Sequence, residues 1–88
     1  MLSAEVIRAR IVAALPDADV VVNDYTGTGD HFEARVVAPA FEGLSMIEQH
    51  KRVYAPLADW LATGELHALA LKTYSPAAWT AVQSGGKK

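Results

Sequence analysis

The chain has 88 residues, of which 51% are hydrophobic and 20% charged, with a formal net charge of −2 and no cysteine. This length supports one domain with a modest core and excludes a deep, enclosed active site. The lack of cysteine excludes disulfides, cysteine nucleophiles and an iron–sulfur cluster held by thiolates of this chain. The acidic charge balance argues against a dedicated nucleic-acid binder, because such proteins usually carry a basic face.

The first part of the chain predicts a helix followed by a β-hairpin. Ser3 is a good N-cap, apolar residues then recur at helical spacing, and Pro16 ends the pattern, so we expect a helix over residues 4–15. Residues 19–25 contain three consecutive valines and end in an aromatic residue, Tyr25, and they predict a strand. After a glycine-containing connection, residues 31–38 alternate in the manner of a half-buried strand, which completes the hairpin.

The second part predicts a long helix, a third strand and a short last helix. Apolar residues between 46 and 61 fall near one stripe, and Pro56 predicts a kink or a break because proline removes one helical hydrogen bond. His50 lies on this stripe, so we expect its ring to be partly buried and hydrogen-bonded. Residues 66–74 predict the third strand, and the Ser-Pro pair at 75–76 suits the start of a helix.

The order α-β-β-α-(α)-β-α predicts an α+β domain with a three-stranded mixed sheet and helices packed on one face. The crossover from the second strand to the third is right-handed if these strands are parallel. A ferredoxin-like half-unit is the main alternative. We expect one domain over residues 1–83 and a flexible tail over 84–88. No stretch approaches the roughly 18 apolar residues of a membrane span, and no secretory signal is evident, so we expect a cytoplasmic protein.

Two histidines fall at strand starts. His31 opens the second predicted strand and His67 the third, and neighbouring parallel strands begin at the same end of a sheet, about 4.8 Å apart. Their neutral imidazoles could therefore share one metal-sized site. Strict alternation places His31 with Glu33 but His67 with Leu69, so the connection at 26–30 would have to turn His31 toward its partner. A histidine at a strand end is more often a surface or hydrogen-bonded residue, and the pattern alone leaves both interpretations open.

No catalytic constellation stands out in the sequence. We find no Ser/His/Asp arrangement and no distinctive pair of acids, so no enzymatic activity is expected. The Gly-Thr-Gly at residues 27–29 is too short for a dinucleotide fingerprint, and no helix is expected after it. The Gly-x-x-Gly loop of RNA-binding K-homology modules is absent from the expected helix–helix position.

The most informative stretch is residues 64–79, Gly-Glu-Leu-His-Ala-Leu-Ala-Leu-Lys-Thr-Tyr-Ser-Pro-Ala-Ala-Trp. Upstream lie Gly-Asp-His-Phe-Glu at 29–33, Phe-Glu-Gly at 41–43 and His-Lys-Arg-Val-Tyr at 50–54. In this order and spacing the segments resemble the BolA family, whose signature reads roughly His-Ala-Leu…Lys-Thr-Tyr before Pro-x-x-Trp. The resemblance covers nearly the whole chain and implies a K-homology-like (BolA-like) topology, which does not by itself imply RNA binding.

The resemblance also implies a metal site and a partner. In BolA-like proteins the histidine that matches His67 ligates a [2Fe-2S] cluster shared with a monothiol glutaredoxin and its glutathione. The second ligand comes from the loop matching residues 26–31, as a cysteine or a histidine, and His31 is the residue of this chain that fits. The implied role is iron–sulfur cluster trafficking, or the sensing of iron, redox state or stress. The isolated chain, a monomer or weak homodimer, is expected to hold no cluster.

Lys72, Thr73 and Tyr74 are candidate partner-binding residues. The small residues Ala68 and Ala70 share a strand face with Lys72 and Tyr74, and small side chains permit close approach by another protein.

DNA binding is the alternative function, because BolA-like proteins are also linked to transcriptional control of stress responses and cell morphology. The contacts would be Lys51, Arg52 and Lys72, with Tyr54 or Tyr74.

Overall fold

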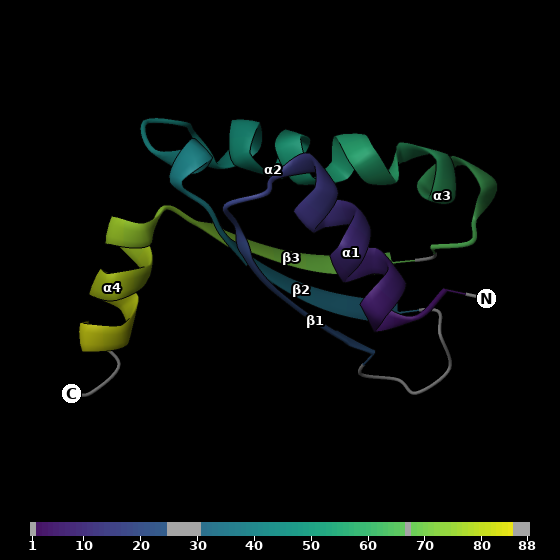
Figure 1. The fold of residues 1–88 in the computed structure, drawn as a ribbon, viewed down its shortest axis with the longest axis horizontal. Helices are drawn as coiled ribbons and strands as arrows, with labels where there is room; N and C mark the ends of the chain where they lie inside the picture. The colour runs from purple at the N-terminus through teal and green to yellow at the C-terminus, as the bar shows by residue number, and fades with distance from the viewer. Residues whose placement is uncertain (1, 25–30, 67, 86–88) are drawn as a thin grey trace.

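The computed structural model describes residues 2–24, 31–66 and 68–85 (Figure 1). Its order of helices and strands confirms the predicted α+β class. In chain order the elements are α1 (Ala4–Ala14), β1 (Asp19–Asp24), β2 (His31–Val37), the 3₁₀ turn η1 (Pro39–Phe41), α2 (Met46–Tyr54), the 3₁₀ turn η2 (Ala55–Leu57), α3 (Ala58–Thr63), β3 (Ala68–Tyr74) and α4 (Pro76–Gly85).

The three strands form one sheet in the order β1-β2-β3. β1 pairs antiparallel with β2, with Asp19 opposite Val37, which confirms the hairpin. β2 pairs parallel with β3, with His31 opposite Ala68. The two parallel strands therefore begin at the same end of the sheet, and β1 and β3 are its two edges.

The core lies between one face of the sheet and the layer formed by α1, α2 and α3 (Figure 1). We call this side of the sheet the covered face. The alternation predicted for β2 is confirmed here, because Phe32, Ala34 and Val36 have no exposed surface while Glu33 between them is exposed. α1 contributes Ile7 and Ile11, the turn η2 contributes Leu57, and both elements join the same cluster. We call the opposite side, which carries Glu33, the open face.

The long helical segment breaks at Pro56, as predicted. α2 ends at Tyr54, the turn η2 carries the proline, and α3 continues to Thr63. The break follows from the missing N–H of proline. Gly64 then ends α3 with a φ of 86°, a left-handed conformation that favours glycine. None of the helices in the described ranges is long and apolar enough to cross a membrane.

α4 does not join the helical layer, which corrects the expectation that the helices pack on one face. In Figure 1 it lies beyond the end of β3, apart from α1, α2 and α3. Its Trp79 packs against Tyr74, with ring centroids 5.2 Å apart, and under the guanidinium of Arg35. Arg35 and Tyr74 both belong to the open face, because their register places them in line with Glu33.

Element ends differ from prediction by a few residues. α1 stops at Ala14 because Leu15 is its C-cap. β2 stops at Val37, although the N–H of Ala38 still donates to the Tyr74 carbonyl. The tail was expected from residue 84, whereas α4 runs to Gly85.

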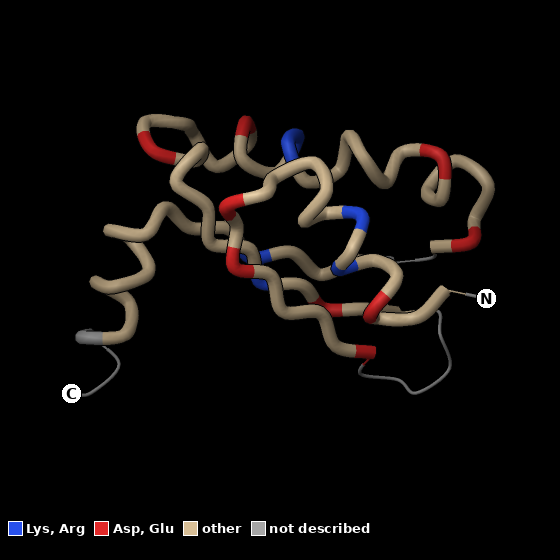
Figure 2. The backbone as a smooth tube through the Cα atoms, viewed as in Figure 1, with Lys and Arg blue, Asp and Glu red and all other residues tan. Residues whose placement is uncertain are grey.

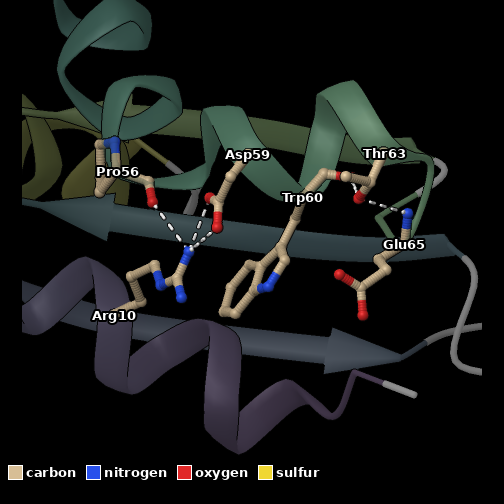
Figure 3. Close-up of polar contacts among 6 residues, drawn as sticks. All are labelled: Arg10, Pro56, Asp59, Trp60, Thr63 and Glu65. Atoms are coloured by element: carbon tan, nitrogen blue, oxygen red, sulfur yellow. Dashed lines mark hydrogen bonds and ion pairs between the residues drawn. The ribbon is translucent and has the colours of Figure 1, made fainter.

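Arg10 ties α1 to the broken helix across the helical layer (Figure 3). Its Nη1 donates to Asp59 Oδ1 at 2.7 Å and Oδ2 at 3.0 Å, and to the Pro56 carbonyl at 3.4 Å. The guanidinium also lies 3.6 Å from the centre of the Trp60 ring. The hydrogen bond from Arg10 holds the pKa of the Asp59 carboxyl below its usual value.

Replacing Asp59 by asparagine should therefore lower stability at neutral pH, and the loss should shrink in acid. A carboxyl whose pKa is depressed by folding stabilises the protein above its unfolded pKa, about 4, and this stabilisation is lost as the pH falls through the folded pKa. Urea denaturation of wild type and Asp59→Asn at pH 7 and at about pH 3 measures the difference. A difference that stays constant over this range would contradict the assignment. Arg10→Met should remove the same pH dependence, since it deletes the donor.

Candidate metal-ligand site at the start of strands β2 and β3

The predicted ligands belong to the end of the sheet where the parallel strands begin. His31 is the first residue of β2, is half-buried, and pairs with Ala68, the first residue of β3. His67 directly precedes Ala68 in the sequence but lies outside the described residues. The structure thus places His31, one of the two predicted ligands. The strand register sets His31 opposite Ala68, the residue that follows His67 in the sequence.

His31 is held by a well-anchored strand. Its neighbour Phe32 has no exposed surface and packs in the core, which fixes the strand over the helical layer. Alternation from Phe32 places His31 on the open face with Glu33, as the sequence predicts. The connection at 25–30, which would have to turn His31, lies outside the described residues.

The donor set decides which metal groups the chain can hold. Among the described residues, no three His, Cys, Asp or Glu side chains form a group that could bind a metal ion. A [2Fe-2S] cluster is normally held by four protein ligands, and this chain has no cysteine. The residues fit such a cluster only as suppliers of imidazole, with thiolates supplied by another molecule.

The three predicted partner-binding residues do not share a surface. Lys72 is exposed and Tyr74 half-buried on the open face. Thr73 is only 3% exposed, and its hydroxyl donates to the sulfur of Met46 at 3.5 Å. The alternation that directs Lys72 and Tyr74 to the open face turns the Thr73 side chain to the covered face, where it packs against Met46 and is not exposed to a partner.

The expectation of a hydrogen-bonded His50 is wrong. Its ring is half-buried and meets Tyr54 edge-on, with centroids 6.2 Å apart and planes at 82°. Its Nε2 is buried without a hydrogen-bond partner among the residues described. The Tyr54 hydroxyl, which could have satisfied a ring nitrogen, donates instead to the Leu69 carbonyl at 3.4 Å.

A leucine at position 50 should therefore match or exceed the wild type in stability, by up to about 1 kcal/mol. The substitution removes a buried polar atom that has no partner and keeps an apolar body of similar size. His50→Ala should cost about 1 kcal/mol, because it removes the contact with Tyr54 without replacing it. Urea denaturation of the wild type and both variants under the same conditions measures both differences. A leucine variant that loses more than the alanine variant would reveal a required polar contact.

One cluster of residues was missed by sequence reasoning. Arg35 and Trp79 stack with 4.4 Å between the guanidinium carbon and the ring centre, at a hollow between the open face and α4. Alternation alone indicates that Arg35 and Lys72 are on outward faces of their strands. Their pairing depends on the register of β2 and β3, which the sequence does not display.

Comparison with known proteins identifies a matching family model, similar sequences and similar solved structures. A sequence model described as BolA-like protein matches residues 5–78. The acid stress protein IbaG of Escherichia coli (strain K12) is 37% identical over 54 residues, which cover 61% of this chain and 64% of IbaG, slightly under two thirds of its length.

Solved structures extend the likeness to the fold. A BolA protein homologue from Coxiella burnetii has a TM-score of 0.75 and 34% identity, over 91% of this chain and 99% of that one. The BolA domain of SufE1 from Arabidopsis thaliana has a TM-score of 0.74 and 32% identity, over 88% of this chain and 98% of that domain. Since the family match spans both the hairpin and the crossover and the folds agree, this chain belongs to the BolA-like protein family.

Proposed function

We propose that this chain is a cytoplasmic adaptor, without enzymatic activity of its own, that binds a monothiol glutaredoxin and completes a bridging [2Fe-2S] cluster through histidine. The glutaredoxin and its glutathione supply thiolates, and this chain supplies imidazole nitrogen. The complex would serve in iron–sulfur cluster trafficking or in sensing iron, redox state or stress. Membership of the BolA-like family supports this proposal, and a relative named for acid stress is consistent with it.

The observation that carries the proposal is the parallel register of β2 and β3. It sets His31 opposite Ala68, so His31 and the residue that follows His67 are direct neighbours across the sheet. At such a sheet end, histidines from two chain segments could bind the same metal cluster. When bound, a cluster with a histidine in place of a thiolate has a lower ligand charge and a higher reduction potential than an all-cysteine one.

The isolated chain should bind no iron–sulfur cluster stably. It has no thiolate, and its histidines supply too few ligands. Anaerobic reconstitution with iron and sulfide tests this, for the chain alone, a monothiol glutaredoxin with glutathione, and the mixture. Visible absorption and circular dichroism of the mixture should differ from those of the glutaredoxin homodimer. A stoichiometric cluster on the chain alone, or a mixture identical to the homodimer, would contradict the proposal.

The DNA-binding alternative receives no comparable support. Its predicted contacts divide between two sides of the sheet, because Lys51 and Arg52 lie on α2 above the covered face and Lys72 lies on the open face. Figure 2 shows acidic and basic residues interspersed over the helices and strands. A genuine phosphate-binding surface would give a steep loss of DNA affinity with salt, and a flat salt titration would exclude it.

A further inference from the structure

A hollow of about 320 Å³ lies between the open face and α4, on the side of the sheet away from α1, α2 and α3. Arg35 of β2 and Lys72 of β3 line it together with the rings of Tyr74 and Trp79. Its volume is at the lower end of the range for sites that hold small molecules.

The register places the two cations of this hollow directly opposite each other. Arg35 pairs with Lys72 across the parallel strands, and both side chains are on the open face. Like charges at facing positions of a sheet repel and destabilise it. The ion pairs found in the described part of the chain involve Arg8 and Arg10 and neither of these two residues. Within the described ranges, therefore, no carboxylate bonded to either cation relieves their repulsion.

Arg35 also has unused hydrogen-bonding capacity. Its guanidinium contacts the Trp79 ring, but its Nε is buried with no acceptor among the described residues. A buried donor without an acceptor costs free energy. Because Nε is buried, the terminal nitrogens of Arg35 are the donors that a ligand in the hollow would meet. Guanidinium groups bind carboxylate and phosphate through two parallel hydrogen bonds, and a lysine beside them adds a point charge.

The remaining lining defines what else a ligand would need. Glu33 and Asn23 line the same hollow. Two cations against one carboxylate leave a positive balance, so the charged group of a ligand would be an anion placed near Arg35 and Lys72. Glu33 would accept a hydrogen bond from a hydroxyl or amino group elsewhere on the ligand. The rings of Tyr74 and Trp79 offer an apolar wall for its body.

We propose that this hollow binds a small organic anion, whose phosphate or carboxylate group lies between Arg35 and Lys72. The site requires neither a cluster nor a glutaredoxin, so it goes beyond the proposed function. It would give the protein a way to respond to a metabolite on the face opposite its helical layer.

The two tryptophans allow a direct test by ¹H–¹⁵N NMR of the full chain. Trp79 lines the hollow, whereas Trp60 is 9% exposed beneath Arg10 and serves as an internal reference. Trp79→Phe assigns the two indole N–H signals. The probes are AMP, the uncharged adenosine, and the dicarboxylate succinate, each titrated to about 10 mM, tenfold above a millimolar Kd.

A saturable shift of the Trp79 signal with an anion, and none with adenosine, would support the proposal. A response to AMP alone identifies phosphate as the group recognised, and a response to succinate alone identifies carboxylate. Equal shifts with adenosine and AMP would overturn the charge-based site. No shift of Trp79 with either anion would also overturn it.

Matched variants separate this site from general charge attraction. Arg35→Gln and Lys72→Gln should each weaken anion binding at least about tenfold, because each removes a charge-assisted hydrogen bond. Lys51→Gln removes one positive charge from α2, on the other side of the sheet, and should retain wild-type affinity. Lys72→Gln should also be at least as stable as wild type without ligand, since it removes the repulsion of Arg35. Equal weakening in all three variants would show nonspecific attraction instead.

Discussion

Replacing His67 by alanine should abolish the visible spectrum that distinguishes the glutaredoxin complex from a glutaredoxin homodimer. The substitution deletes the imidazole that the BolA resemblance assigns to the cluster, and no cysteine of this chain can take its place. The fold should persist, because the sequence places His67 at the start of a predicted strand, where a side chain is expected to contribute little to the core. Absorption and circular dichroism of the anaerobically reconstituted complex measure the spectral change, and far-ultraviolet circular dichroism measures the fold.

The other two histidines are matched controls for this experiment. His31→Ala should have a smaller effect, because water or another group can replace a ligand supplied from beside the 26–30 connection. His50→Ala should leave the spectrum unchanged, since position 50 belongs to α2 and its ring packs against Tyr54. The assignment fails if the His67→Ala complex has the wild-type spectrum and lability, or if His50 controls them.

Phe32→Ala should lower the free energy of unfolding by about 3 to 5 kcal/mol. Phe32 is among the largest side chains with no exposed surface, and it packs between the sheet and the helical layer. Small domains have about 5 to 15 kcal/mol of stability in total, so this one substitution should bring the chain close to unfolding. Urea denaturation monitored by circular dichroism measures the loss.

Its neighbour in the sequence provides the control. His31→Ala changes a half-buried residue at the strand start and should cost far less than Phe32→Ala. The pair therefore tests whether the candidate ligand position can be altered without disturbing the strand that holds it. If the two variants lose comparable free energy of unfolding, His31 is part of the structural core. An effect of His31→Ala on a cluster could then not be distinguished from its effect on the fold.

Local patterns predicted most of the fold because each rests on chemistry confined to a few residues. Alternation in β2 marked its buried face, and the missing N–H of Pro56 marked the break between α2 and α3. The side on which α4 lies was not predictable, because it depends on how the chain turns after Tyr74. The buried state of Thr73 was available from alternation, since Lys72 and Tyr74 flank it and share the other face.

The candidate site was less accessible to sequence reasoning. The pattern placed His31 and His67 at strand starts but favoured a surface or hydrogen-bonded role for each, and the ligand interpretation came from the BolA resemblance. The parallel pairing was expected, whereas the register that sets Arg35 against Lys72 is a property of the assembled sheet. Likewise, helical spacing placed His50 on a buried stripe without revealing that Tyr54 donates to a β3 carbonyl.

The pairing of β2 with β3 joins segments that are distant in the sequence, with α2 and α3 between them. The hairpin of β1 and β2 can form locally, but β3 docks only after the chain has closed a long loop, which is a slow and entropically costly step. β3 is also an edge strand, held by one neighbouring strand. Partial opening of a protein often releases such a unit while the rest stays folded. Under the proposed function, a cluster held by His31 and His67 would lose one ligand in that event, so detachment of β3 would provide a route for handing the cluster to an acceptor.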